Sequence, residues 1–273
     1  MNNKTNISIC GCGWLGFPLG IHLKNEGYEV KGSTRSPQKL AALYENGIQP
    51  FLLEVTKKIK GNNLPLFFQS EILIINIPPG RKRKDVARSH PLQIAALMEK
   101  AISNGVQKII FISSTSVYGN VNRVVTEADE PRPETASGKA LVEAEALLLS
   151  QNTFKTTVLR LGGLVGLNRP AGRFLAGKQG VANGKAPVNM LHQEDAIRII
   201  KKIIEANKWG VIYNVCADEH PTKEAFYTHQ AQKQNFEPPT FLMEADYSFK
   251  EVSNYKLKKE LNYRFLHPDP MGF

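Results

Sequence analysis

The chain has 273 residues, 42% of them hydrophobic, so it can bury a large core, and extended disorder is disfavoured. Its 35 basic and 25 acidic residues give a net charge of +10, which favours anionic partners such as phosphorylated cofactors, phosphorylated substrates or nucleic acid. Three cysteines are too few for a disulfide framework, and no secretory leader or run of about 18 apolar residues is present, so we expect a cytoplasmic protein without a membrane partner.

The first half of the chain alternates short β-rich runs with longer helical patterns. We expect helices that begin near Trp14, Pro37, Ser89 and Thr135. The expected strands are 7–10, 28–32, 49–53, 72–77, 108–112 and 157–161. This alternation is typical of βαβ units, so the predicted fold class is α/β, with a Rossmann-type doubly wound parallel sheet.

After residue 166 the regular alternation stops. Gly, Pro, Asn and Arg dominate residues 168–187, and an expected helix at 193–207, a strand at 211–216 and a helix at 223–234 follow. The predicted domains are a dinucleotide-binding Rossmann domain, 1–166 with 193–217 returning to it, and a smaller C-terminal substrate lobe, 167–192 with 218–273.

Residues 7–16 read ISICGCGWLG, which puts three glycines in G-x-G-x-x-G spacing where an expected strand becomes an expected helix. The first glycine allows a tight turn, the second lets backbone N–H groups approach a pyrophosphate, and the third lets helix and strand pack closely. The helix N-terminus adds a favourable dipole for an anion. A structural βα turn is the alternative to a cofactor loop. The loop residues predicted to bind the cofactor are Gly11, Gly13, Trp14, Leu15 and Gly16.

The end of the second expected strand indicates which dinucleotide binds. An NAD-selective site offers a carboxylate there to the ribose 2′-OH, whereas this chain has Ser33, Thr34 and Arg35. Hydroxyls and a guanidinium suit a 2′-phosphate, so NADP is the predicted cofactor and NAD the less favoured one. A solvated Arg35 that caps the next helix is the alternative. Further cofactor contacts are predicted at Glu54, Asn76 and Pro78.

Four more motifs lie in the predicted loops and strand ends. They are FISSTSVYG at 111–119, E-x-x-x-P at 127–131, RLGGLVG at 160–166 and LHQED at 191–195. Together they resemble the extended short-chain dehydrogenase/reductase family, the nucleotide-sugar epimerases and dehydratases. The resemblance covers nearly the whole chain. It implies a Rossmann domain that carries the cofactor and a C-terminal lobe that holds an anionic, often nucleotide-linked, substrate.

The family's catalytic Y-x-x-x-K pair has no counterpart in the helix where it normally lies. Aligning Lys139 with the family lysine places Thr135 at the tyrosine, and aligning Ser137-Gly138 with the usual Tyr-Gly places Leu141 at the lysine. An aliphatic hydroxyl ionises far above the tyrosine pKa of about 10, so neither register supplies the base. The missing tyrosine and the unusual glycine spacing indicate an atypical subgroup.

The resemblance assigns the active-site hydroxyl to Ser114. Tyr118 is predicted either to replace the missing phenol or to pack beside the substrate without titrating. Lys139 is predicted either to bind the nicotinamide ribose or to be a solvated lysine of the first helical turn. The Y-x-x-x-K pattern of Tyr255 to Lys259 is interpreted as a coincidence on a charged helix.

Substrate contacts are predicted at Arg169, Arg173 and His192, with an ordinary structural hydrogen bond as the alternative for the histidine. The basic run 81–84 is either a solvated loop or a steering patch, and without an aromatic stacking motif we do not expect nucleic acid as a partner. Because Cys10 and Cys12 lack companion ligands, no metal site is predicted. A homo-oligomer is left open.

The leading hypothesis is an NADP-binding oxidoreductase or epimerase of the short-chain class, in which Ser114 holds the reacting oxygen. The alternative hypothesis is a non-catalytic dinucleotide-binding sensor, in which the lost tyrosine reflects lost chemistry. A weaker third hypothesis is a nucleic-acid-binding protein that uses the basic excess.

Overall fold

The computed structural model describes residues 5–80, 85–243 and 245–273, so the basic run 81–84 lies outside the described residues. The chain forms two compact units. The first contains residues up to 117 together with 133–159 and 203–212, and the second contains 118–132, 160–202 and 213–273. The domain bounds expected from the sequence, 1–166 with 193–217 and 167–192 with 218–273, stay a prediction.

The main sheet has eight strands in the order β11-β8-β6-β5-β1-β2-β3-β4. Their bounds are β1 Asn6–Cys10, β2 Glu29–Thr34, β3 Gln49–Val55, β4 Ile59–Gly61, β5 Ile72–Ile75, β6 Lys108–Ser114, β8 Lys155–Leu161 and β11 Ile212–Val215. β1 pairs in parallel with both β2 and β5, and the short β4 is antiparallel to β3. The predicted α/β fold with a Rossmann-type parallel sheet is confirmed.

The order of the strands reverses between β1 and β5. The chain builds outward from β1 through β2 to β3, then returns to the other side of β1 as β5 and β6. Ligands of such sheets bind beyond the carboxyl ends of the strands at this reversal. All four residues of β5 are buried, as expected for a central parallel strand that is covered on both faces.

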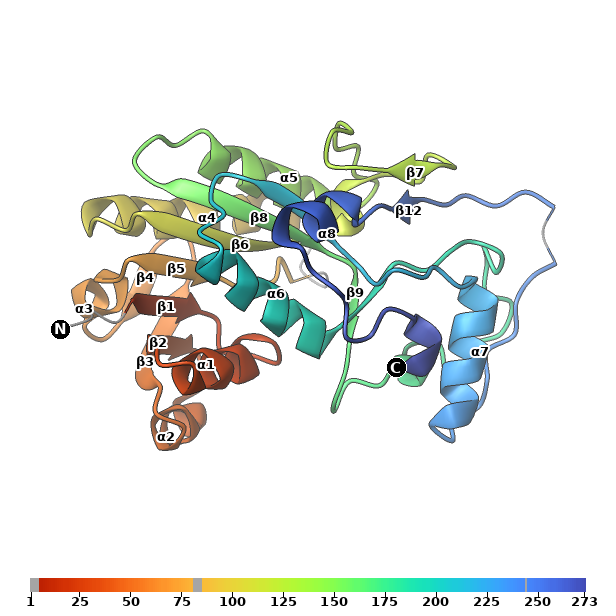
Figure 1. The fold of residues 1–273 in the computed structure, drawn as a ribbon, viewed down its shortest axis with the longest axis horizontal. Coiled ribbons are helices and arrows are strands. Elements are labelled where there is room, and N and C mark those ends of the chain that lie inside the picture. The colour runs from red at the N-terminus through yellow and green to blue at the C-terminus, as the bar shows by residue number, and fades with distance from the viewer. Residues whose placement is uncertain (1–4, 81–84, 244) are drawn as a thin grey trace. The chain divides into compact units, whose positions relative to one another are not determined.

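Helices flank the sheet of the first unit, with α1 on one side and α5 on the other (Figure 1). α1 packs on β1 and β2, α2 packs on β3, and α4 packs along α5. The helices are α1 Gly16–Asn25, α2 Leu40–Glu45, α3 Leu64–Phe68, α4 Val86–Ser103 and α5 Ala136–Leu149, with short 3₁₀ turns η1 Pro37–Lys39 and η2 Thr115–Val117. These helices begin near the predicted positions, apart from α3 and η2, which were not predicted.

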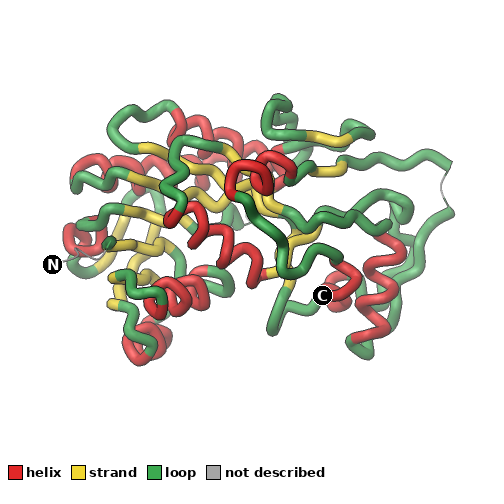
Figure 2. Tube along the Cα trace, viewed as in Figure 1, coloured by secondary structure: helices red, strands yellow, loops and turns green. Residues whose placement is uncertain are grey.

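The second unit is built from short elements joined by long loops (Figure 2). Its two small sheets pair β9 with β10 and β7 with β12, both in parallel. The elements are β7 Val124–Val125, β9 Gly163–Val165, η3 Ala171–Phe174, β10 Met190–His192, α6 Gln193–Glu205, α7 Lys223–Lys233, β12 Glu251–Val252, α8 Tyr255–Leu261 and η4 Pro270–Gly272. α6 begins in this unit and ends in the first.

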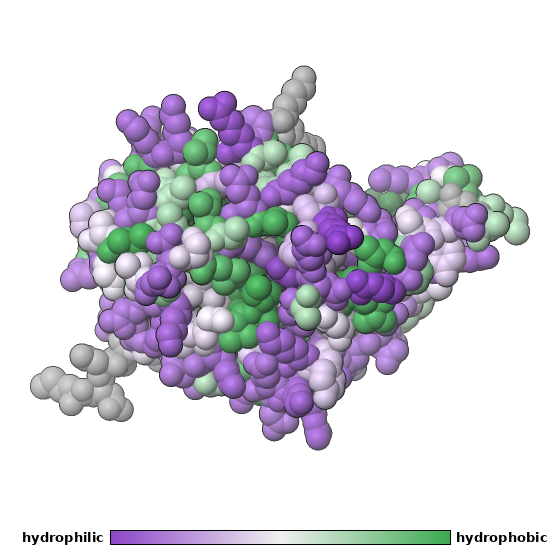
Figure 3. Space-filling model, turned by 90° about the horizontal axis from the view of Figure 1, so that it is seen from above, coloured by the Kyte–Doolittle hydropathy of each residue, from purple (hydrophilic) through white to green (hydrophobic). Residues whose placement is uncertain are grey.

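Hydrophilic side chains cover most of the face shown in Figure 3, in keeping with the charged content of 22%. Within the described part of the chain, every helix is too short or too polar to cross a bilayer.

Candidate cofactor cleft and polar sites

A cleft of about 500 Å³ opens in the first unit, at the carboxyl ends of β1, β2 and β5. It therefore lies at the reversal of strand order where this class of sheet binds ligands. Its lining includes seven residues predicted to contact the cofactor: Gly11, Gly13, Ser33, Thr34, Arg35, Asn76 and Pro78. Their role in binding stays a prediction.

At two positions of the glycine loop, neighbouring protein atoms leave space for glycine alone. Gly11 has a φ of +106°, and a Cβ there would lie 2.6 Å from the backbone oxygen of Asn76. A Cβ on Gly16 would lie 2.2 Å from the oxygen of Gly11. The Asn76 side chain donates from Nδ2 to that same oxygen at 2.9 Å. The glycine loop therefore packs tightly against the segment after β5, and there is no space for a side chain at Gly11 or Gly16.

Gly13 differs from the other two glycines because a Cβ there would meet no protein atom within 4 Å. Gly13 is exposed and lines the cleft. The protein therefore leaves space at the middle glycine, where a dinucleotide-binding loop receives the pyrophosphate. Together with the helix N-terminus that follows at Gly16, this space fits the predicted cofactor.

The glycine loop is tied to the end of β2. The backbone N–H of Gly11 donates to Ser33 Oγ at 3.1 Å, and that of Cys12 donates to the Ser33 carbonyl oxygen at 2.7 Å. The Cys12 side chain packs over Gly32, where a Cβ would lie 2.7 Å from the sulfur. Burial raises the pKa of Cys10 and of Cys12 to about 12, so both are neutral packing thiols.

Two cations line the cleft just after β2. Arg35 is exposed, and Lys39 at the end of η1 is exposed beside it in the lining. Neither forms an ion pair with another residue that the structure describes. Thr34 Oγ1 accepts from the Ser36 backbone N–H at 3.1 Å, which fixes the turn that carries both cations. Lys39 was missed from the sequence, although it lies four residues after Arg35 in the predicted helix.

Four of the predicted cofactor residues lie outside the cleft lining. Trp14 is half-buried and Leu15 is buried at the start of α1. Gly16 packs against Gly11 as described above. Glu54 is an exposed residue of β3, and its neighbours Leu53 and Val55 line the cleft instead. The alternation of side chains along a strand explains this difference, because adjacent residues point to opposite faces.

Ser114 is half-buried at the end of β6. Its Oγ accepts from the Ser116 backbone N–H at 3.2 Å. The preceding Ser113 donates from Oγ to the buried carboxylate of Glu145 on α5 at 2.5 Å. This bond fastens the end of β6 to α5. Glu145 could not be recognised from the sequence, because an acidic residue within a helical pattern is normally solvated.

The start of α5 is the place where the family's Y-x-x-x-K pair would lie, and other residues occupy it here. Thr135 is the N-cap, and its Oγ1 accepts from the Gly138 backbone N–H at 3.0 Å. Lys139 is exposed, whereas Leu141 is buried. A Cβ on Gly138 would lie 2.4 Å from the Ser116 backbone oxygen, so this glycine allows α5 to approach the segment after β6. Thr135 therefore has a structural role at the helix end.

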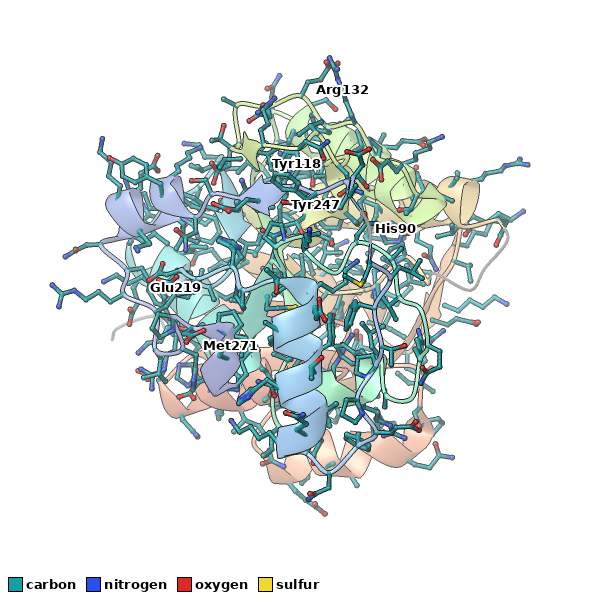
Figure 4. All side chains as sticks on the ribbon, turned by 90° about the vertical axis from the view of Figure 1, so that its right-hand side faces the viewer. His90, Tyr118, Arg132, Glu219, Tyr247 and Met271 are labelled. Carbon is teal, nitrogen blue, oxygen red and sulfur yellow. The ribbon has the colours of Figure 1, made fainter. Side chains whose placement is uncertain are left out.

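Tyr118 belongs to the second unit, where it is only 3% exposed; Figure 4 shows it within that unit, with Arg132 projecting outward. Its hydroxyl accepts from Arg160 Nη1 at 2.7 Å. The same hydroxyl lies 2.9 Å from Asn214 Oδ1 and 3.0 Å from the Thr126 carbonyl oxygen, which are its acceptors. Burial raises the pKa of Tyr118 above its usual value. A tyrosine that is enclosed and harder to ionise does not suit the role of a base near neutral pH.

Two residues from the motifs that resemble the family lie beside Tyr118 and its hydrogen-bond partners. Arg160, from RLGGLVG, also stacks over the Tyr118 ring, with its guanidinium carbon 5.0 Å from the ring centre. Glu127, from E-x-x-x-P, accepts from the Asn214 backbone N–H at 2.7 Å. The sequence marked both positions without assigning them a role.

The predicted substrate residues Arg169, Arg173 and His192 all belong to the second unit. Arg169 and Arg173 are exposed next to and within η3, and the Arg169 guanidinium lies over the Phe174 ring at 5.7 Å. His192 is half-buried at the end of β10, with its ring centre 3.8 Å from that of His267.

Comparisons with known proteins agree with this architecture. Residues 9–216 match the model of the NAD dependent epimerase/dehydratase family. The Escherichia coli K12 protein YeeZ is 35% identical over 269 residues, which covers 97% of each chain. A functionally unknown conserved protein from Silicibacter pomeroyi DSS has a TM-score of 0.79 at 23% identity, covering 99% of this chain and 96% of its own. MoeE5, solved with UDP-glucose and NAD, has a TM-score of 0.78 at 19% identity, covering 98% and 96%.

Proposed function

Since this chain belongs to the NAD dependent epimerase/dehydratase family, we propose that it is an NADP-binding oxidoreductase or epimerase that acts on an anionic or nucleotide-linked substrate. The observation that carries the proposal is the cleft of the first unit, where a glycine loop with open space at Gly13 adjoins the two cations Arg35 and Lys39.

Different residues of the cleft would bind different parts of the cofactor. The backbone N–H groups of the glycine loop and of the start of α1 would hold the pyrophosphate. Arg35 and Lys39 would hold the 2′-phosphate of NADP, because both are exposed cations and no carboxylate of β2 lines the cleft beside them. MoeE5 was solved with NAD, which supports a nicotinamide dinucleotide, and the cations support the phosphorylated form.

Ser114 would hold the reacting oxygen of the substrate, since its Oγ is half-buried and accepts a bond from the chain that follows it. A bound nicotinamide dinucleotide supplies hydride transfer. The proton carrier is not Tyr118 in this proposal, because that hydroxyl is already bonded to Arg160 and faces two acceptors.

A binding experiment tests the choice of cofactor. Calorimetric titration of the wild-type protein should show NADPH binding about ten- to a hundredfold more tightly than NADH, the equivalent of about one charge-assisted hydrogen bond. Arg35→Ala and Lys39→Ala should each weaken NADPH binding and leave NADH binding unchanged. Lys100→Ala removes an exposed charge on α4 outside the cleft lining and is the matched control.

Equal affinity for NADPH and NADH, or equal losses in the Arg35→Ala and Lys100→Ala variants, would refute the NADP assignment. Absence of binding to either nucleotide by the folded protein would refute the cofactor site itself.

Turnover separates the enzyme from a second candidate function, a dinucleotide-binding sensor. The sensor is favoured by one observation, the enclosed Tyr118 in a chain that has no tyrosine at the usual position. NADPH oxidation and NADP reduction should be followed against sugar nucleotides and small carbonyl compounds. Turnover that is lost in Ser114→Ala supports the enzyme, whereas tight NADPH binding without turnover of any substrate supports the sensor.

A further inference from the structure

Three side chains with metal-binding atoms lie together in the second unit: His192 at the end of β10, Glu194 in the first turn of α6, and His267 near the C-terminal end of the described chain. One ligand atom from each lies within 4.8 Å of the other two. We propose that these residues bind a divalent transition-metal ion of the Zn²⁺ type. The proposal is independent of the cofactor cleft, since every residue involved belongs to the second unit.

The separation of two of the ligand atoms matches a zinc site. Nε2 of His267 lies 3.1 Å from Oε2 of Glu194. In a tetrahedral site with zinc–ligand bonds of about 2.0–2.1 Å, neighbouring ligand atoms lie about 3.3 Å apart. A metal ion can therefore take the place of the shared proton with little movement of either side chain.

His192 can become the third metal ligand after a small rotation of its ring and a shift of its proton. Its ring lies 3.8 Å from that of His267, centre to centre, and its Nδ1 accepts from the Glu194 backbone N–H at 3.3 Å. This bond is long, so losing it costs little when the proton moves to Nδ1 and Nε2 turns toward the metal.

The position of His267 is fixed by a buried carboxylate. Asp195 is fully buried and accepts from the backbone N–H groups of Leu266 and His267 at 2.8 and 2.9 Å. It also accepts from the Tyr263 hydroxyl at 2.7 Å. Since Asp195 directly follows Glu194, one helical turn both supplies a ligand and anchors the segment that supplies another. Residues that position metal ligands through hydrogen bonds in this way are typical of metal sites.

The donor set favours zinc over magnesium or calcium. Two imidazole nitrogens and one carboxylate suit Zn²⁺, whereas Mg²⁺ and Ca²⁺ prefer oxygen ligands throughout. All three side chains are half-buried, so water can fill the fourth position. A bound ion would join the start of α6 to the C-terminal segment, and it should stabilise the fold because it binds only where these elements meet.

Calorimetric titration with ZnCl₂ tests the site, using untagged, chelator-treated full-length protein. We expect one ion per chain, and a loss of affinity of about tenfold or more in His192→Ala and in His267→Ala. His229→Ala is the matched control, because His229 is an exposed histidine of α7 outside the cluster. Zn²⁺ should raise the melting temperature of the wild type and of His229→Ala, and not that of His267→Ala.

A second measurement keeps the test sharp if an alanine variant folds poorly. Co²⁺ bound to the wild type should give the intense visible bands of a tetrahedral site, and Glu194→Gln should weaken them while the protein keeps its circular dichroism spectrum. Zinc binding that is absent in the wild type, or equal in wild type, His192→Ala and His267→Ala, would overturn the proposal.

Discussion

At the scale of single residues, the glycine loop separates the needs of the fold from the needs of a ligand. Gly11 and Gly16 are surrounded by protein atoms, whereas the Cβ position of Gly13 points into open space. The spacing of the three glycines predicted these separate roles: a tight turn, the approach to a pyrophosphate and close packing of the helix. The difference arises because the backbone of Asn76, 65 residues further along, closes over the first glycine and not over the second.

This contrast makes Gly13→Ala and Gly11→Ala a matched pair. Gly13→Ala should keep the stability of the wild type and lose about tenfold or more in NADPH affinity, because the new methyl group would fill space that the pyrophosphate needs. Gly11→Ala should lower the free energy of unfolding by about 1–3 kcal/mol, because it forces an L residue into a positive φ against a backbone oxygen. Urea denaturation and NADPH titration check both. Unchanged NADPH affinity in a stable Gly13→Ala variant would contradict the ligand role.

Tyr118 has two interpretations from the sequence, and the bonds of its hydroxyl give an experiment that separates them. Its hydroxyl is enclosed by Arg160 and Asn214, so Tyr118→Phe should lower the free energy of unfolding by about 1–3 kcal/mol, because buried polar partners are left without it. NADPH affinity should be unchanged, and so should the pH profile of any activity. Urea denaturation, NADPH titration and kinetics check these outcomes. A shifted pH profile in the variant would return Tyr118 to the role of proton carrier.

At the scale of elements, the long periodic segments were predictable and the short ones were not. Strands such as 72–75 are apolar runs, and helices such as 136–149 carry a clear period, so local sequence specifies them. β4, β7 and β12 have two or three residues each, too few to show a pattern. They form because tertiary contacts bring their backbones beside a partner strand.

The first turn of α5 gives a prediction at this scale. Thr135→Ala should lower the free energy of unfolding by about 1 kcal/mol, since it removes the N-cap bond to Gly138. Thr135→Asn keeps a capping oxygen and removes the hydroxyl, so it should restore both stability and any activity. Thermal denaturation measures the first effect and turnover the second. Activity that is lost in Thr135→Asn, with stability restored, would instead assign the hydroxyl to the chemistry of the missing tyrosine.

At the scale of the whole molecule, composition indicated a preference for anions without a location. The net charge of +10 is spread along the whole chain; the end of the second strand already indicated Arg35, and the fold adds Lys39 to the lining of the same cleft. The predicted domain boundaries followed motif positions along the chain, whereas the two units follow contacts in space. Residues 118–132 illustrate the difference, because Tyr118 and Glu127 bond to Asn214, almost a hundred residues away.

Ligand-linked stability tests the proposed function on the intact protein without knowledge of the substrate. A ligand that binds only the folded state stabilises it by about 2.7 kcal/mol when its concentration is a hundred times its Kd. For a chain of this size such a gain raises the melting temperature by about 5 °C. NADPH at that excess should produce the shift in the wild type and in Lys100→Ala. At the same concentration, a tenfold loss of affinity leaves about 1.4 kcal/mol, so Arg35→Ala and Gly13→Ala should each show about half of the wild-type shift or less. Equal shifts in all four proteins would mean that the nucleotide binds elsewhere, because only the last two variants alter the cleft.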